Sequence, residues 1–290
     1  MSGTQSHAYL LRQPEARTTS VVFASPHSGR IYQPAFMQQV ILDQHEIRSS
    51  EDAFVDDLFG SAVKHGAPLL MAQSPRAYVD LNRGAEELDP AVIEGIRRVS
   101  HNSRISSGLG IIPRVVSNGR AIYRGKISLE EAHDRIDQVW RPYHDALQTV
   151  LDEAHREFGE AILIDCHSMP HEALENICAP GASRPDIVLG DRFGAAAASS
   201  VMERVEAAFA SAGFKVARNM PFAGAYICQN YGRPSRRYHA LQIEIDRSIY
   251  MDEKTITPNA NYGAFKAVLD GIIAELAGIG RIGSQRLAAE

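Results

Sequence analysis

The 290-residue sequence is poor in cysteine, in long apolar runs and in runs of one charge, and each shortage excludes a class of protein. Its three cysteines, Cys166, Cys178 and Cys228, are an odd number at wide spacing, which excludes a disulfide-built fold and is typical of reduced thiols in a cytosol. No apolar stretch approaches the roughly 18 residues that cross a bilayer. The first residues lack a basic segment followed by an apolar one, so no secretory signal is predicted. We therefore expect a cytoplasmic protein without a membrane partner.

Charge and composition indicate a folded enzyme or binding protein. Acidic residues outnumber basic ones by 35 to 30 and no lysine/arginine run is present, so the chain offers nucleic acid little electrostatic attraction. Hydrophobic residues at 44% and charged residues at 22% exclude a disordered or collagenous chain. Without a linker or a repeat, residues 1–290 are predicted to form a single domain with its core at about 20–275. The sequence leaves the oligomeric state open.

Short β-branched runs alternate with helical patterns along the chain. The runs typical of buried strands are residues 20–24, 68–71, 77–79, 161–165, 187–189 and 241–246. The clearest helix begins at a candidate capping box of Ser128 and Glu131 and continues to Phe158, with a kink expected at Pro142. Further helices are predicted at 193–209 and 265–276. This alternation predicts an α/β sheet covered by helices on both faces.

Two predicted strands run directly into a histidine. Residues 21–25 lead to His27, and residues 162–164 lead to Asp165 and His167. Because the carboxyl ends of strands line the ligand crevice of an open α/β sheet, both rings are expected there. Paired histidines are a common beginning of a zinc site, with Asp165 as a hydrogen-bond partner behind His167. The alternative is that both histidines only cap strand ends by hydrogen bonding.

The residues alone leave the acidic candidates open. Glu51 and Asp52 precede an amphipathic segment at 53–59. Either one of these two acids is a metal ligand, or both are first-turn acids that complement the dipole of a helix. Glu244 lies within the apolar strand 241–246 and shares a face with Gln242. Its carboxylate is either on an exposed polar face or in a site that raises its pKa, as a general base requires.

Arginine is the expected partner of an anionic substrate. Residues 77–79 are followed by Asp80, Asn82 and Arg83, and a guanidinium at a strand end can bind a carboxylate through two hydrogen bonds. Five further arginines are candidates, although most arginines are expected on the surface or in ion pairs: Arg30, Arg76, Arg120, Arg124 and Arg247.

Several familiar motifs are excluded. A G-x-G-x-x-G match at 278–283 follows a helix near the end of the sequence, so it does not open a dinucleotide-binding unit. No G-x-S-x-G elbow, P-loop or H-E-x-x-H pair is present. Cys166 precedes His167 directly, and adjacent strand residues point to opposite faces. We therefore predict a buried Cys166 packed against helices rather than a nucleophile.

Six segments, in this order along the chain, together resemble the N-formylglutamate amidohydrolase family. They are residues 25–29, 51–59, 80–83, 163–170, 186–191 and 239–247. The resemblance implies a three-layer α/β/α fold with a mixed, largely parallel sheet, similar to that of zinc carboxypeptidases and aspartoacylase-type hydrolases. Those relatives use an H-x-x-E pair, but Arg30 stands three residues after His27 here. The resemblance assigns the carboxylate ligand to Asp52 instead, with Glu51 as the substitute.

The resemblance also implies a reaction and a role for each site residue. The activity is metal-dependent hydrolysis of N-formyl-L-glutamate to L-glutamate and formate, the closing step of one histidine-degradation route. Zinc, or another divalent metal, would be held by His27, Asp52 and His167. Glu244 would act as the general base for a zinc-activated water. The substrate carboxylates would be bound by Asn82, Arg83 and Arg247.

Two other functions fit the same residues. One is the hydrolysis of another N-acyl amino acid or a carboxypeptidase-like activity, since formyl and acetyl groups are not distinguished by residue patterns. Residues 108–110 and 223–226 are expected to shape that acyl pocket. The other is a non-catalytic protein on the same scaffold that binds an acidic ligand through Asn82 and Arg83.

Overall fold

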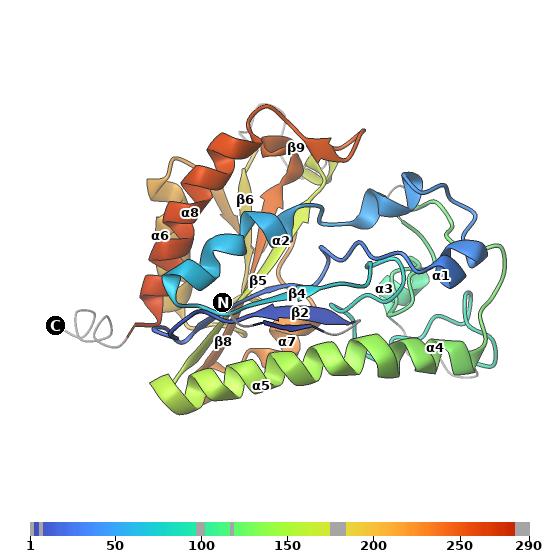
Figure 1. Ribbon diagram of the computed structural model, residues 1–290, viewed down its shortest axis with the longest axis horizontal. Helices are drawn as coiled ribbons and strands as arrows, with labels where there is room; N and C mark the ends of the chain where they lie inside the picture. The colour runs from blue at the N-terminus through green and yellow to red at the C-terminus, as the bar shows by residue number, and fades with distance from the viewer. Residues whose placement is uncertain (1–2, 6–7, 97–101, 117–118, 175–183, 282–290) are drawn as a thin grey trace.

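The computed structural model describes residues 3–5, 8–96, 102–116, 119–174 and 184–281, so Cys178 and Gly283 lie outside the described residues. Within these ranges eight strands form one sheet in the order β1-β2-β4-β3-β5-β8-β6-β7 (Figure 1). Its strands are β1 (Gly3–Gln5), β2 (Tyr9–Arg12), β3 (Val21–Ser25), β4 (Leu69–Ala72), β5 (Ala161–Met169), β6 (Ile187–Gly190), β7 (Val216–Arg218) and β8 (Tyr238–Asp246). A separate ribbon pairs β9 (Met251–Asp252) with β10 (Thr257–Pro258).

The sheet is mixed, as predicted. Strands β4, β3, β5 and β8 run parallel at its centre. Strand β2 is antiparallel to β4, and β6 is antiparallel to β8, whereas β7 runs parallel to β6. The carboxyl ends of β3, β5 and β8 therefore lie together at one edge of the sheet.

Helices cover both faces of the sheet, which confirms the three-layer prediction (Figure 1). The helices are α1 (Pro34–Gln39), α2 (Val55–Leu58), α3 (Ser103–Ser106), α4 (Leu129–Arg135), α5 (Arg141–Phe158), α6 (Ser199–Ser211), α7 (Tyr226–Tyr231) and α8 (Tyr262–Ile279). Residues of α5 and α7 pack in the core on one face, and residues of α2, α6 and α8 pack in the core on the other. None of these helices in the described part of the chain is long and apolar enough to span a bilayer.

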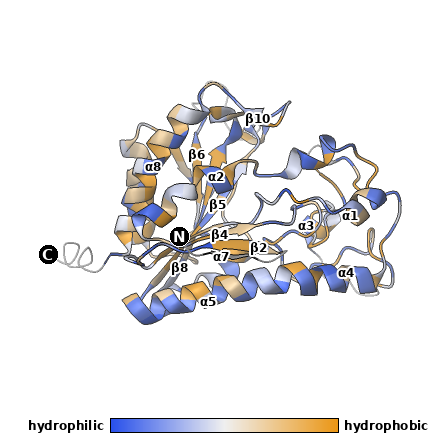
Figure 2. Ribbon diagram, in the orientation of Figure 1, coloured by the Kyte–Doolittle hydropathy of each residue, from blue (hydrophilic) through white to orange (hydrophobic). Residues whose placement is uncertain are grey.

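Alternation of side chains along β5 divides its residues between the two cores. Ile162, Ile164 and Cys166 lie in the core beneath α6 and α8, while Leu163 lies in the core beneath α5. Both faces of the strand are buried, and the central strands are correspondingly hydrophobic in Figure 2. Since successive residues point to opposite faces, His167 points away from Cys166. The predicted burial of Cys166 on a helix-covered face is confirmed.

One predicted strand is wrong, and one predicted helix begins later than expected. Residues 77–79 form a turn rather than a strand, because the N–H groups of Tyr78 and Val79 both donate to the carbonyl of Pro75. The helix expected from residue 193 begins only at Ser199. Residues 192–194 before it have φ values of 57°, 57° and 85°, and this left-handed turn prevents an earlier α-helical start.

The predicted helix from Ser128 to Phe158 is continuous in space but not uniformly α-helical. Ser128 caps α4 by accepting a hydrogen bond from Glu131 N, which confirms the predicted start. A π-helical turn, η4 (Ile136–Trp140), joins α4 to α5 immediately before Pro142. Figure 1 shows α4 and α5 following one another along one line, so the π-turn accommodates Pro142 without a sharp bend.

Helix α5 and the π-turn hold the loop that follows β4. His144 Nε2 lies 2.9 Å from the carbonyl oxygen of Leu81, and Trp140 Nε1 donates to the carbonyl of Arg83 at 2.8 Å. Because a carbonyl can only accept, Nε2 of His144 carries the proton, and its Nδ1 accepts from the Tyr231 hydroxyl at 2.8 Å. A neutral histidine therefore fixes the position of this loop.

Stability is expected to fall below neutral pH because of His144. Burial lowers the pKa of His144 from 6.5 to about 3, so between these values the unfolded chain binds a proton that the folded chain does not. The contribution of neutral His144 to the free energy of unfolding is complete above pH 6.5. It declines by about 1.4 kcal/mol per pH unit as the pH falls toward 3. Urea unfolding at several pH values should show a shallower decline for His144→Gln than for wild type. Parallel curves would contradict the assignment.

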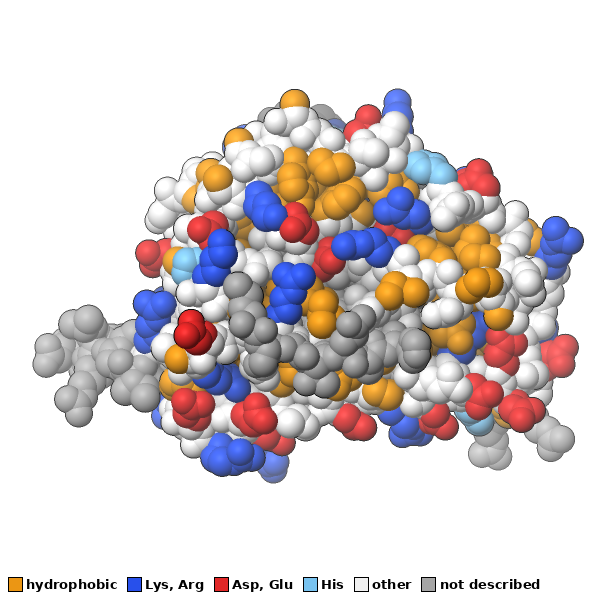
Figure 3. All heavy atoms as spheres, viewed as in Figure 1, with side chains coloured by type: hydrophobic (Ala, Val, Ile, Leu, Met, Phe, Trp, Pro, Cys, Tyr) orange, Lys and Arg blue, Asp and Glu red, His pale blue; other side chains and the backbone are white. Residues whose placement is uncertain are grey.

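The surface shown in Figure 3 mixes charges of both signs. Lysine and arginine side chains are interspersed there with aspartate and glutamate side chains, and apolar side chains lie between them. Attraction for an anionic ligand must therefore come from arginines gathered locally at a binding site.

Candidate active site

A pocket of about 600 Å³ opens at the carboxyl ends of β3, β5 and β8. A volume of this size suits a small-molecule ligand. The seven residues to which the resemblance assigned a role all line the pocket, namely His27, Asp52, Asn82, Arg83, His167, Glu244 and Arg247. Among the further arginine candidates Arg76 also lines it, whereas Arg30, Arg120 and Arg124 do not. The two predicted wall segments also reach it, through Leu109 and through residues 223–225.

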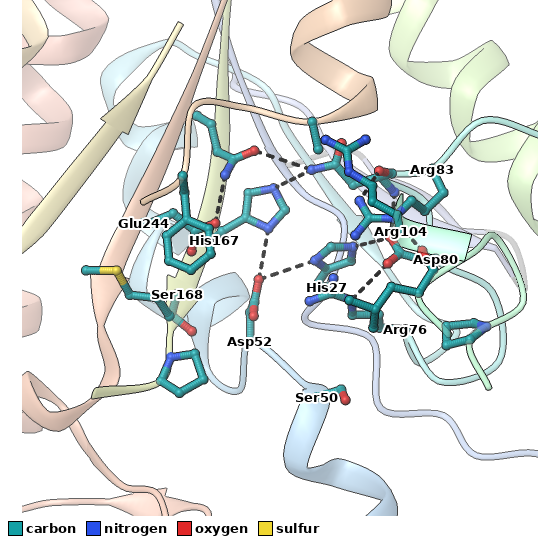
Figure 4. A pocket seen from close by; sticks show the side chains of 18 of the residues that line it. His27, Ser50, Asp52, Arg76, Asp80, Arg83, Arg104, His167, Ser168 and Glu244 are labelled. Atoms are coloured by element: carbon teal, nitrogen blue, oxygen red, sulfur yellow. Dashed lines mark hydrogen bonds and ion pairs between the residues drawn. The ribbon is translucent and has the colours of Figure 1, made fainter. Parts of the chain in front are cut away.

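Three side chains meet in the pocket with their ligand atoms toward one another. His27 and His167 each offer a ring nitrogen and Asp52 offers a carboxylate oxygen, and these three atoms lie within 4.8 Å of one another. Asp52 Oδ2 is 2.9 Å from His167 Nδ1 and 3.5 Å from His27 Nδ1. Figure 4 shows Asp52 between the two rings, and all three residues are buried. Two imidazole nitrogens and one carboxylate oxygen are typical protein ligands of a catalytic zinc ion.

The far nitrogen of each ring faces another carboxylate. His167 Nε2 lies 3.0 Å from Asp165 Oδ2, as the sequence predicted. His27 Nε2 lies 2.7 Å from Asp80 Oδ1, and Arg76 Nε donates to the second oxygen of Asp80 at 3.0 Å. A carboxylate in this position keeps the proton on Nε2 and leaves Nδ1 available to a metal. Without a metal, His167 Nδ1 donates a proton to Asp52 Oδ2; a bound metal would take the place of that proton, and both rings can offer Nδ1 to it.

The three residues fit a bound divalent cation. His27 Nδ1 is buried and has no hydrogen-bond partner among the described residues. Burial lowers the pKa of His167, but the carboxylates of Asp165 and Asp52 outweigh it and raise that pKa well above 6.5. Burial raises the pKa of Asp52, yet the two imidazoles hold it well below its ordinary value. An unpartnered buried acceptor in a place that attracts positive charge suits a metal.

The neighbouring acids Glu51 and Asp52 point to different partners. Glu51 accepts hydrogen bonds from the Tyr32 hydroxyl at 2.7 Å and from Arg48 Nη2 at 3.1 Å. Asp52 N donates to the carbonyl of His27 at 3.0 Å, which ties this segment to the turn after β3. Of the two acids that the sequence left open, the structure places Asp52 between the histidines.

Glu244 lies directly beside His167 in the sheet. The register of β5 and β8 pairs the two residues, and Gln242 Nε2 donates to Glu244 Oε1 at 2.7 Å. Gln242 and Glu244 both line the pocket, which confirms that they share a polar face of β8. Burial, reinforced by the charge of Asp52, raises the pKa of Glu244 to about 7. A carboxylate with this pKa is suited to accept and return a proton near neutral pH.

Two predicted substrate-binding residues hold other parts of the site. Arg247 Nη2 donates to Asp52 Oδ1 at 2.9 Å, and Arg247 Nε donates to Ser168 Oγ at 3.2 Å. Asn82 Oδ1 accepts from Ile227 N at 2.8 Å, so it joins the loop after β4 to helix α7. Contact of either side chain with substrate stays a prediction, whereas both clearly position their neighbours.

The sequence predicts no specific role for Asp80, Gln242 or Arg104. Asp80 is a polar residue able to bind metal or move protons after a predicted strand, and Gln242 shares a face with Glu244. Arg104 carried no signal, because it lies on the four-residue helix α3 in an irregular stretch of the chain. Only the tertiary structure brings α3 to the pocket.

Comparisons with known proteins point to one family. A family model for N-formylglutamate amidohydrolase matches residues 19–251. The curated N-formylglutamate deformylase of Pseudomonas aeruginosa is 29% identical over 241 residues, covering 81% of this chain and 83% of that protein. The N-formylglutamate deformylase of Pseudomonas putida is 28% identical over 240 residues, covering 80% of this chain and 82% of that protein.

Solved structures show the same relationship. The crystal structure of N-formylglutamate amidohydrolase from Ralstonia eutropha JMP134 is 33% identical with a TM-score of 0.89, covering 95% of this chain and 99% of that chain. A gene product of Agrobacterium tumefaciens shares the fold at 17% identity and a TM-score of 0.64, covering 98% of this chain and 96% of that chain. The family match spans every residue of the pocket. The chain is therefore an amidohydrolase that belongs to the N-formylglutamate amidohydrolase family.

Proposed function

We propose that this chain hydrolyses N-formyl-L-glutamate to L-glutamate and formate, and that His27, Asp52 and His167 hold a divalent metal, with zinc preferred. The observation that carries the proposal is the placement of Glu244 directly beside this three-ligand cluster. The family match supports the substrate. The reaction would serve as the closing step of a histidine-degradation route.

The chain's own groups account for holding the metal and moving the proton. When bound, a divalent metal supplies Lewis-acid stabilisation of negative charge on the carbonyl oxygen and makes water more acidic. Asp80 and Asp165 orient the two ligand rings, and Arg247 orients Asp52. These contacts keep the ligand atoms in place before substrate arrives, which lowers the reorganisation that catalysis requires.

Glu244 is placed to move the proton of the reaction. Its carboxylate accepts a proton from the water that attacks the formyl carbon. The carbon–nitrogen bond then breaks, and Glu244 returns the proton to the leaving nitrogen, so that formate and the amine of glutamate separate. The hydrogen bond from Gln242 to Oε1 holds the carboxylate in one orientation.

Arg83 supplies positive charge for a substrate carboxylate. Its Nε donates to the carbonyl of Leu109 and its Nη1 to the carbonyl of Asn82, each at 2.8 Å. These bonds fix the plane of the guanidinium at the pocket wall, and it forms no ion pair with a carboxylate of the described residues. A guanidinium held in this way is ready to bind a carboxylate without losing further side-chain freedom.

The test is release of formate and glutamate from N-formyl-L-glutamate by zinc-loaded protein, with N-acetyl-L-glutamate as the competing substrate. We expect equal amounts of formate and glutamate, and a loss of activity on chelation that zinc restores. Zinc content is measured in the same samples. Zinc-loaded protein that releases acetate but no formate would overturn the substrate, and equal activity without zinc would overturn the role of the metal.

A further inference from the structure

Four arginines line the described part of the pocket, and they differ in their partners. Arg76 is paired with Asp80, and Arg247 is paired with Asp52. Arg83 donates to backbone carbonyls. Arg104 makes no side-chain hydrogen bond or ion pair among the described residues. Two guanidinium groups in one pocket are therefore left without a carboxylate partner.

Arg104 and Arg83 lie beside each other at one side of the pocket (Figure 4). Burial lowers the pKa of Arg83; the negative charge of Asp80 opposes that effect, and the positive charges of Arg76 and Arg104 add to it. Like charges held close together in a partly buried site repel each other unless an anion lies between or in front of them. The arrangement indicates a binding place for negative charge.

The chain holds Arg104 in this place firmly. The Asn102 side chain caps α3 by accepting from Arg104 N, and it donates to Glu87 at 2.8 Å. Leu109 N donates to the carbonyl of Arg104, and Leu109 O accepts from Arg83 Nε. Leu109 therefore links the backbone of Arg104 to the guanidinium of Arg83, so the fold sets how far apart these two groups lie.

The pocket lining that follows Arg104 in the sequence is largely apolar, with Ser107 as a polar member. Leu109, Pro113, Val115 and Val116 line the pocket together with Arg104. Such a wall suits the methylene groups of an aliphatic side chain, and a guanidinium beside it suits a terminal carboxylate. Arg83 is bonded to Asn82 O, and Asn82 Nδ2 lies 3.3 Å from His167 Nε2. Arg83 is thus tied to the ligand cluster, whereas Arg104 comes from the apolar wall.

We propose that Arg104 binds the distal carboxylate of the substrate side chain and so selects N-acylated dicarboxylic amino acids over those with a neutral side chain. Arg83 then takes the carboxylate next to the scissile amide. This assignment rests on the proposed hydrolysis of N-formyl-L-glutamate and adds to it a residue that determines specificity. Two guanidinium groups without carboxylate partners match the two carboxylates of such a substrate.

The test compares N-formyl-L-glutamate with N-formyl-L-glutamine, which has the same shape but an uncharged side chain. For Arg104→Met, kcat/KM for the glutamate substrate should fall about 10- to 100-fold, mainly through KM, as expected for loss of a charged hydrogen bond. The value for the glutamine substrate should stay as in wild type. Arg104→Lys should retain part of the preference, and Arg124→Met, which removes an exposed arginine outside the pocket, should change neither value.

The outcomes separate this assignment from the proposed function. Equal losses on both substrates, or an unchanged preference in Arg104→Met, would overturn the assignment while the hydrolysis stands. Wild-type protein with bound zinc that releases no formate from either substrate would overturn the proposed function, and the assignment with it. Circular dichroism checks that each variant is folded. If Arg104→Met does not fold, Arg104→Gln is used instead to measure the ratio of kcat/KM for the two substrates.

Discussion

Replacing Glu244 with glutamine is expected to lower kcat for formate release by about 10²- to 10⁴-fold, the usual contribution of a general acid–base residue. Glutamine keeps the length and shape of the side chain but cannot accept a proton from water. Gln242, which donates to Glu244 Oε1, can still donate to the amide oxygen of the variant. The pocket should therefore keep its geometry. Initial rates and bound zinc are measured on the same preparations.

Zinc content decides how a loss of activity in Glu244→Gln is interpreted. Glu244 does not belong to the cluster of His27, Asp52 and His167, so the variant should hold as much zinc as wild type. Low activity with full zinc content supports proton transfer by Glu244. Wild-type turnover in the variant would remove Glu244 as the base, and loss of zinc would show that it acts through the metal site.

Replacing Asp52 with asparagine is expected to abolish both zinc binding and hydrolysis. The substitution removes the negative charge that lies 2.9 Å from His167 Nδ1 and 3.5 Å from His27 Nδ1. The loss of zinc affinity should exceed the roughly 10- to 100-fold that removal of a hydrogen-bond partner behind a metal ligand costs. Zinc titration against a competing chelator measures it.

Glu51→Gln is the matched control for Asp52→Asn. Both variants neutralise a buried acid, and the two positions are adjacent. Glu51 bonds to Tyr32 and Arg48 rather than to the histidines, so its variant should retain zinc and activity. If Glu51→Gln lost zinc and Asp52→Asn kept it, the ligand assignment would be reversed.

The sequence was sufficient to locate the two histidines. His27 and His167 each follow a buried apolar strand, and in a parallel arrangement the carboxyl ends of such strands meet. Alternation along a strand likewise predicted that Glu244 shares the face of Gln242 and that Cys166 is buried behind His167. These predictions hold because strand periodicity is a local property that tertiary contacts reinforce.

Local patterns were misleading where turns replaced regular structure. Residues 77–79 resemble a short strand, and Ala77 and Val79 are indeed buried. Their backbone, however, bonds within a turn at Pro75, and Asp80 N bonds to the distant carbonyl of Ile111. Burial in an irregular loop thus produces the same hydrophobic pattern as a short strand.

The sequence by itself determined the layered fold, the strand ends that carry His27 and His167, and the polar face of Glu244, because each depends on periodicity within one segment. The tertiary structure placed Asp52 between the histidines, as the resemblance implied, and only that structure placed Asp80 behind His27 and brought Arg104 to the pocket. Those features depend on contacts between segments far apart in the chain, such as Asp52 N with His27 O. Spacing within a segment carries no information about which distant backbone or side-chain group will meet it in the fold.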